Sequence, residues 1–168
     1  MAQKIYLLTG LPGSGKSTWS RNVAENPNII IICEDNIRLM LKGKYVFDPL
    51  YEPLVKEIAG AAFNDALMAG FDIILDEVYY TKALRAKSID QIKNHTLPTE
   101  LEIICVWFTE NQNNLRYRMK ESRGYSDLKW EEVITTMSQN FEIPTLDEGF
   151  DDIIEIPFKE AAPSPCEI

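Results

Sequence analysis

Short apolar runs alternate along the chain with longer stretches in which apolar side chains recur at helical spacing. The short runs are rich in Ile, Leu and Val, which is typical of strands buried on both faces of a parallel sheet. We predict strands at 4–9, 29–33, 71–75, 101–108 and 153–156. The helical spacing predicts helices at 16–25, 53–68, 81–94, 111–121 and 127–141. This alternation over short connections predicts an α/β fold, a doubly wound parallel sheet of about five strands flanked by helices.

Polar or glycine-rich segments directly follow the first three predicted strands, at 10–16, 34–38 and 76–77. In a doubly wound sheet, ligands bind at the carboxyl ends of the strands. The three segments therefore predict one functional site at this edge of the sheet.

The first of these segments has the spacing of a phosphate-binding loop. Residues 10–17 are GLPGSGKS, which fits the pattern G-x-x-x-x-G-K-S/T between a strand and a helix. Glycines let backbone N–H groups turn towards phosphate oxygens, and the helix that follows adds its positive end. In this pattern Lys16 reaches the β and γ phosphates and Ser17 binds Mg²⁺. The alternative is a flexible Gly/Ser turn that matches the pattern by chance. From average residue usage, the probability of such a chance match in the whole chain is under about 1%. We predict binding of ATP and Mg²⁺, with nucleotide contacts from Gly10, Pro12, Gly13, Ser14, Gly15, Lys16, Ser17 and Thr18.

Two carboxylates follow the neighbouring strands. Asp76 ends an apolar strand, the place of a Walker B carboxylate that orients Mg²⁺ through water; the alternative is a cap on the next segment. Asp35 follows the second strand, where a carboxylate can accept the proton of a hydroxyl during phosphoryl transfer. Arg38, one helical turn later, can hold a substrate phosphate with two N–H groups. By themselves these two residues fit an N-cap with an exposed arginine, but the neighbouring phosphate loop favours the functional interpretation.

A basic helix face is expected in the region 111–126. Arg116, Lys120 and Arg123 are spaced at i, i+4 and i+7, with Gly124 next as a hinge or helix end. A solvated charged face is the usual explanation for such a run. The alternative that we favour is a helical lid that closes over ATP, with Arg116 at the nucleotide and Arg123 as the catalytic cation.

Composition limits the classes of protein. The chain has 26 acidic and 17 basic residues and a formal net charge of −9, with much of the acidity in residues 142–168. This charge argues against a protein that coats nucleic acid, although a local basic groove for a few nucleotides stays possible. The chain has no apolar run of the roughly 20 residues that a membrane span needs and no signal-peptide core at 5–8. We expect no membrane contact and a cytoplasmic location, in the host cytoplasm if a phage encodes the protein.

The domain organisation follows from length and cysteine use. We expect one P-loop kinase domain over 1–156. Residues 157–168 are expected to form a flexible tail, because they include three prolines and have little to bury. Cys33 and Cys105 lie in apolar runs and are expected to be buried, reduced thiols.

The motifs together resemble those of a known family. They are GLPGSGKSTW (10–19), EDNIR (34–38), KYVFDPLYEPLV (44–55), FDIILDE (71–77), SRG (122–124) and FEIPTLDEGFDDII (141–154). The chain resembles the kinase domain of phage polynucleotide kinase and its relatives among small P-loop kinases with an adenylate-kinase-like three-layer fold. The phosphate loop is common to many families, whereas D-x-x-R after the second strand and E-G-F-D near the end are more specific.

The resemblance implies ATP-dependent phosphorylation of a hydroxyl, usually the 5′-OH of a nucleic acid. It implies that Asp35 is the general base, Arg38 a substrate-phosphate contact, Asp76 a support in the acceptor site and Arg123 the lid arginine. The chain departs from the family where relatives commonly have D-x-T-N, because it has Asp76-Glu77-Val78-Tyr79-Tyr80 instead. This departure leaves the identity of the acceptor open.

Aromatic residues near the expected acceptor side can either stack a base or pack under a loop. They are Tyr45, Phe47, Tyr51, Tyr79 and Tyr80, of which Tyr45 is the predicted substrate contact. The favoured function is transfer of the γ-phosphoryl group of ATP to the 5′-OH of a polynucleotide, with nucleic acid as substrate partner. Alternative acceptors are a hydroxymethyl pyrimidine in DNA, a nucleoside or a small metabolite. An alternative of another class is a nucleotide-dependent ATPase or switch without an acceptor.

Overall fold

The computed structural model describes residues 2–45, 47–94, 100–109 and 127–157. Its centre is a five-stranded parallel sheet with strand order β2-β3-β1-β4-β5. The strands are β1 (Gln3–Thr9), β2 (Ile29–Ile32), β3 (Asp72–Leu75), β4 (Leu101–Phe108) and β5 (Asp152–Ile156). Each lies within two residues of its predicted bounds, so the predicted fold class is confirmed.

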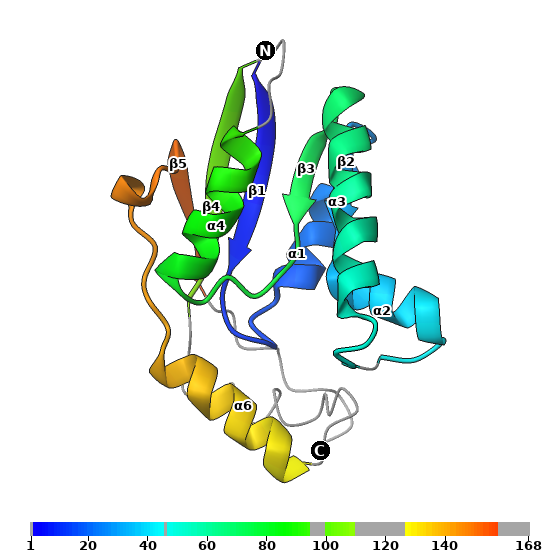
Figure 1. The fold of residues 1–168 in the computed structure, drawn as a ribbon. Coiled ribbons are helices and arrows are strands. Elements are labelled where there is room, and N and C mark those ends of the chain that lie inside the picture. Colours follow the sequence, from blue (N-terminus) through cyan, green and yellow to red (C-terminus); the bar gives the residue numbers. More distant parts are fainter. Residues whose placement is uncertain (1, 46, 95–99, 110–126, 158–168) are drawn as a thin grey trace, which may run out of the picture.

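Helices cover both faces of the sheet (Figure 1). They are α1 (Lys16–Val23), α2 (Glu34–Lys42), α3 (Glu52–Met68), α4 (Lys82–Lys93), α6 (Asp127–Gln139) and the 3-10 helix η2 (Leu146–Glu148). In the view of Figure 1, α3 and α4 lie in front of the sheet, α1 lies behind it, and α6 lies beyond the carboxyl ends of the strands. Among the described residues, no helix combines the length and the apolar character that crossing a membrane requires.

Two apolar layers hold the helices to the sheet, because successive side chains of a strand point to opposite faces. Ile5 and Leu7 of β1 belong to the layer under α3 and α4, which also includes Leu67 and Ile89. Leu8 belongs to the opposite layer, together with side chains of β3, β4, β5 and α1. A sheet buried on both faces explains the continuous apolar runs of its strands.

Helix α2 was not predicted as a complete element. The sequence indicated only a helical turn around Asp35 and Arg38, whereas the structure has nine helical residues that end at Gly43, with φ 67°. Helix α3 begins one residue before its predicted start and ends where predicted. Val55, Ala66 and Leu67 are its buried residues, whereas side chains between residues 56 and 64 line the cavity described below.

The predicted lid at 111–126 lies outside the described residues, as does the tail apart from residue 157. The carboxyl ends of β1, β2 and β3 lie at one edge of the sheet because the strands are parallel. The three predicted site segments therefore meet at this edge.

Candidate functional site at the carboxyl edge of the sheet

The phosphate loop connects β1 to α1 in a conformation that needs its glycines. Gly15 is the N-cap of α1 and has φ 99°, a left-handed conformation that other residues rarely adopt. A Cβ on Gly10 would lie 2.9 Å from the Ser14 hydroxyl and 2.9 Å from Cβ of Phe108. The loop can therefore pack against β4 only with glycine at position 10.

Lys16 lies in the loop with its ammonium group turned inward. Its side chain is 7% exposed, and Nζ donates hydrogen bonds of 2.8 Å to the carbonyl oxygens of Gly10 and Leu11. Ser17 and Thr18 follow at the exposed start of α1. A cation and the first N–H groups of a helix are thus gathered at one point, an arrangement suited to phosphate.

Ser14 gives a second indication that the loop fits an anion. Its hydroxyl oxygen is buried and has no hydrogen-bond partner among the described residues. Buried polar atoms nearly always have a partner, so an unpaired hydroxyl in a phosphate loop is explained when a ligand oxygen supplies one. The residues between Gly10 and Thr18 that are predicted to bind ATP therefore fit a phosphate group.

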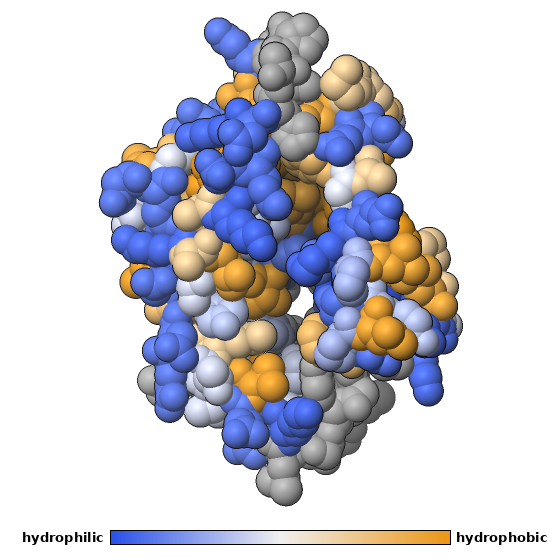
Figure 2. Space-filling view, viewed as in Figure 1, coloured by the Kyte–Doolittle hydropathy of each residue, from blue (hydrophilic) through white to orange (hydrophobic). Residues whose placement is uncertain are grey.

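One large cavity joins the phosphate loop to the segments after β2 and β3. Its volume is about 1840 Å³, and its walls come from the loop, α2, α3, α4 and α6. Figure 2 shows the molecule hollowed near the centre of this face, with both apolar and hydrophilic residues around the opening. Lys16, Asp35, Asp76 and Tyr45 all line this cavity, so the structure brings these four predicted residues into one space.

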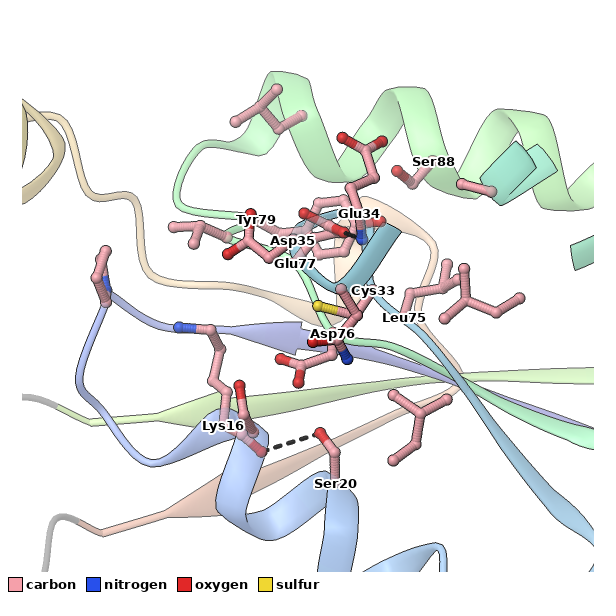
Figure 3. Close-up of a pocket in the computed structure, with 18 of the residues that line it drawn as sticks. Lys16, Ser20, Cys33, Glu34, Asp35, Leu75, Asp76, Glu77, Tyr79 and Ser88 are labelled. Atoms are coloured by element: carbon pink, nitrogen blue, oxygen red, sulfur yellow. Dashed lines mark hydrogen bonds between the residues drawn. The ribbon is translucent and has the colours of Figure 1, made fainter. Parts of the chain in front are cut away.

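Asp76 lies at the bottom of the cavity, directly after β3. Its backbone N–H donates to the Ile32 carbonyl at 2.9 Å, which fixes it against β2, and the residue is 7% exposed. Figure 3 shows its carboxylate between Cys33 and Lys16. The described residues contain no cluster of three or more His, Cys, Asp or Glu side chains that could hold a metal. Mg²⁺ in a phosphate-loop site takes only one or two protein ligands besides phosphates and water, so Ser17 and Asp76 fit that ion.

Asp35 is held by an arginine that has several carboxylate partners. Nη1 of Arg38 donates to Asp35 at 2.7 Å, and Nη2 donates to Glu34 at 2.9 Å. Glu52 at the start of α3 accepts from Nε at 2.8 Å and from Nη2 at 2.7 Å. These hydrogen bonds raise the pKa of Arg38 and lower the pKa of Glu52. Arg38 is only 7% exposed, so in this arrangement it orients Asp35 and joins α2 to α3.

Glu77 is a site residue to which the sequence analysis gave no role. Its Oε1 accepts the backbone N–H of Glu34 at 2.5 Å, so it links the end of β3 to the start of α2. Burial raises the pKa of Glu77 to about 8, and the nearby charge of Glu34 adds to this effect. The signal in the sequence was a second carboxylate directly after Asp76 at the end of an apolar strand.

The predicted aromatic residues lie in different surroundings. Tyr45 and Phe47 line the cavity, and the Phe47 ring lies 5.7 Å from the Arg38 guanidinium carbon while the residue stays 47% exposed. Tyr79 also lines the cavity, and burial raises the pKa of its hydroxyl, which pairs with Ser88. Tyr51 contacts Lys42, whose Nζ lies 3.9 Å from the ring centroid. Phe47 is therefore an accessible aromatic surface beside Asp35 and Arg38.

Both described cysteines are free thiols, as predicted. Cys105 is buried, whereas Cys33 is only partly buried and lines the cavity. Burial raises the pKa of Cys33 to about 12, and the carboxylates of Glu77, Asp76 and Asp35 also favour its neutral form.

The comparisons with known proteins agree with this geometry. The model of the AAA domain family matches residues 5–144, most of the chain. The chain belongs to the AAA domain family. This is a family of P-loop kinases, and membership implies the use of ATP.

The individual relatives and similar structures have names that point to different substrates. A probable thymidylate kinase of Methanosarcina mazei is 26% identical over 132 residues, 77% of this chain and 56% of that protein. A chain of the Pnkp1/Rnl/Hen1 complex is 26% identical with a TM-score of 0.56, covering 70% of this chain and 39% of its own length. A fungal RNA kinase is 18% identical with a TM-score of 0.67, covering 98% of this chain and 79% of its own, and shows the shared fold. The chain thus spans about half the length of the curated relative.

The E-G-F-D motif of this AAA domain protein anchors the fold rather than lining the cavity. Glu148 accepts hydrogen bonds of 2.6 and 2.9 Å from Arg85, which is fully buried. Phe150 packs in the core, and Asp151 exchanges backbone and side-chain hydrogen bonds with Ile103 of β4. The predicted lid residues Arg116, Lys120 and Arg123 lie outside the described residues.

Proposed function

We propose that the protein transfers the γ-phosphoryl group of ATP to the 5′-OH of a nucleic acid. The observation that carries this proposal is that Asp35 lines the same cavity as Lys16 and the phosphate loop. A nucleotide-dependent switch has no need of a carboxylate base at that place, whereas a kinase acting on a hydroxyl does.

In this reaction the acceptor oxygen attacks the γ-phosphorus in line with the bond to the β-phosphate oxygen. That bond breaks, ADP leaves, and the hydroxyl proton passes to Asp35. Lys16 offsets charge on the β and γ oxygens, while Ser17 and Asp76 would hold Mg²⁺. Mg²⁺, when bound, neutralises charge that develops on the transferring group. Arg116 as a nucleotide contact and Arg123 as the catalytic cation are the proposed residues of a lid, which lies outside the described part of the chain.

Support for a nucleic acid acceptor comes from the cavity and from the relatives. The part of the cavity beside Asp35 has exposed Phe47 and partly exposed Tyr45, surfaces on which a base can stack. The similarity to a chain of the Pnkp1/Rnl/Hen1 complex covers 70% of this protein. Arg38 and Tyr45 are the proposed contacts with the acceptor.

A second candidate is a kinase of a free nucleotide or nucleoside. The similarity to a probable thymidylate kinase favours it, because that relative is as similar in sequence as the complex chain. Both candidates use the same phosphate loop, so only the acceptor separates them.

The test of the base assignment is Asp35→Asn. The amide keeps the size of the side chain but cannot accept the proton, so kcat for transfer from ATP to a 5′-OH oligonucleotide should fall about 10²- to 10⁴-fold. ATP binding, measured by fluorescence titration, should stay within about threefold because the phosphate loop is intact. Asp65→Asn on the exposed face of α3 is the matched control and should have wild-type kcat. Near-normal turnover of Asp35→Asn would remove Asp35 as the base.

A further inference from the structure

The first helical N–H of α2 finds its acceptor outside its own chain segment. The N-cap residue is Cys33, whose side chain makes no capping hydrogen bond. The first N–H groups of any helix have no partner within the helix, and one that is withdrawn from water needs another acceptor. Glu34 provides the first helical N–H of α2, and its hydrogen bond is partly buried.

Glu77 supplies that acceptor from a different strand. Its Oε1 lies 2.5 Å from the Glu34 nitrogen, although the two residues are 43 positions apart. Glu77 is itself placed firmly, because the preceding residue, Asp76, continues the β2–β3 pairing through its hydrogen bond to Ile32. In Figure 3, Glu34, Asp35 and Glu77 lie together above the end of β3.

The consequence concerns Asp35, the next residue along the helix. Arg38 fixes its carboxylate at 2.7 Å, and the first turn of α2 positions its backbone. We propose that Glu77 is a positioning residue, which caps α2 from the end of β3 and thereby holds the base Asp35 at the correct distance from the phosphate loop. This inference rests on the proposed function of Asp35. It assigns a role to the carboxylate that directly follows Asp76.

The hydrogen bond predicts a difference between two substitutions of Glu77. Glu77→Gln keeps an oxygen acceptor, so kcat should stay within about threefold of wild type. Glu77→Ala removes the acceptor, and kcat should fall about 10- to 100-fold with little change in KM for ATP, because a small misplacement of a catalytic group has effects of this size. Equal losses in the two variants, or no loss in Glu77→Ala, would overturn the proposal.

The donor side of the same bond can be removed without touching Glu77. Proline is favoured at the first position of a helix and has no N–H, and the extended Cys33 (φ −141°, ψ 114°) suits a residue before proline. Relative to Glu34→Ala, Glu34→Pro should therefore lower kcat about as much as Glu77→Ala lowers it relative to wild type, and the double variant Glu34→Pro with Glu77→Ala should be no worse than Glu34→Pro. Glu34→Ala is the control, since it removes the same carboxylate but keeps the N–H. An additive loss in the double variant would contradict the proposal.

Hydrogen exchange separates this inference from the proposed activity. In Glu77→Ala the amides of residues 34–38 should exchange about tenfold faster than in wild type or Glu77→Gln, while those of α3 should not change. If wild type transfers no phosphate to a 5′-OH, the proposed function fails and the exchange rates still test the cap. Unchanged exchange at 34–38 in Glu77→Ala would overturn the cap even in an active kinase.

Discussion

At the scale of single residues, the carboxylate partners of Arg38 limit how this arginine can bind a substrate phosphate. A guanidinium has five N–H groups, and the bonds to Glu34, Asp35 and Glu52 use four of them. Among the described residues one N–H is thus left for a substrate phosphate. The predicted two-point grip on such a phosphate requires that a carboxylate, such as Glu52, gives up its place.

Cys33 provides a test of how the cavity treats charge. Burial and three nearby carboxylates raise its pKa to about 12, so the thiolate, the reactive form, is rare at pH 8. Alkylation of Cys33 by iodoacetamide, followed by mass spectrometry, should be at least about 100-fold slower than for free cysteine, whose pKa is about 8.5. Because the pKa is raised, the rate should keep rising about tenfold per pH unit from pH 8 to 11.

The control is alkylation of Cys33 in the protein unfolded in urea. There the thiol has its ordinary pKa, so its rate should level off above about pH 9. Fast alkylation of Cys33 in the folded protein at pH 8 would show that the cavity does not disfavour negative charge at this point.

At the scale of elements, a buried ion pair connects α4 to the segment before β5. Arg85 is fully buried and Glu148 nearly so, and Arg85 also donates to the Tyr79 carbonyl at 3.1 Å. Burial alone would raise the pKa of Glu148, but the hydrogen bonds from Arg85 and Thr145 outweigh it and lower the pKa. The pair therefore holds both the connection from β3 to α4 and the C-terminal segment in place.

Removal of one member should be costly because it leaves a buried charge without a partner. Arg85→Met should lower the free energy of unfolding in urea by about 3–5 kcal/mol, and Arg85→Met with Glu148→Leu should recover most of this loss. The control is Glu102→Gln at the partly exposed Lys4–Glu102 pair. This substitution should change the free energy of unfolding by less than about 1 kcal/mol. Because the folded pKa of Glu148 is lowered, its contribution is present above about pH 4.5 and is lost as pH falls below it. A cost below 1 kcal/mol for Arg85→Met would contradict this account.

Sequence patterns predicted the elements that rest on local signals and missed contacts between distant residues. The apolar run of β4 is continuous, and its predicted bounds match the structure. The phosphate loop was found for the same reason, since its residues are adjacent in the chain. In contrast, Glu52 is 14 residues from Arg38, and Glu77 is 43 residues from the N–H that it accepts. Only the fold brings these groups together, so spacing along the chain could not reveal them.

At the scale of the molecule, the parallel sheet places the phosphate loop and Asp35, the proposed base, along a common cavity. The net charge of −9 is compatible with this picture, because phosphoryl transfer to one end of a nucleic acid needs only a local contact. The cavity continues past Asp35 between α3 and α4, where Lys56, Phe63 and Gln91 line it. We expect these side chains to influence which acceptor fits beside Asp35.

The most direct measurement is transfer of labelled γ-phosphate from ATP, with Mg²⁺, to a panel of acceptors. The panel holds 5′-OH DNA and RNA oligonucleotides, DNA with hydroxymethyl pyrimidines, free nucleosides and thymidylate, and Lys16→Ala is the inactive control. The account predicts label on the 5′ end of an oligonucleotide, removable by a phosphatase. Label on a base, on a nucleoside or nucleotide, or only in released phosphate would contradict the proposed acceptor while leaving the P-loop kinase assignment in place.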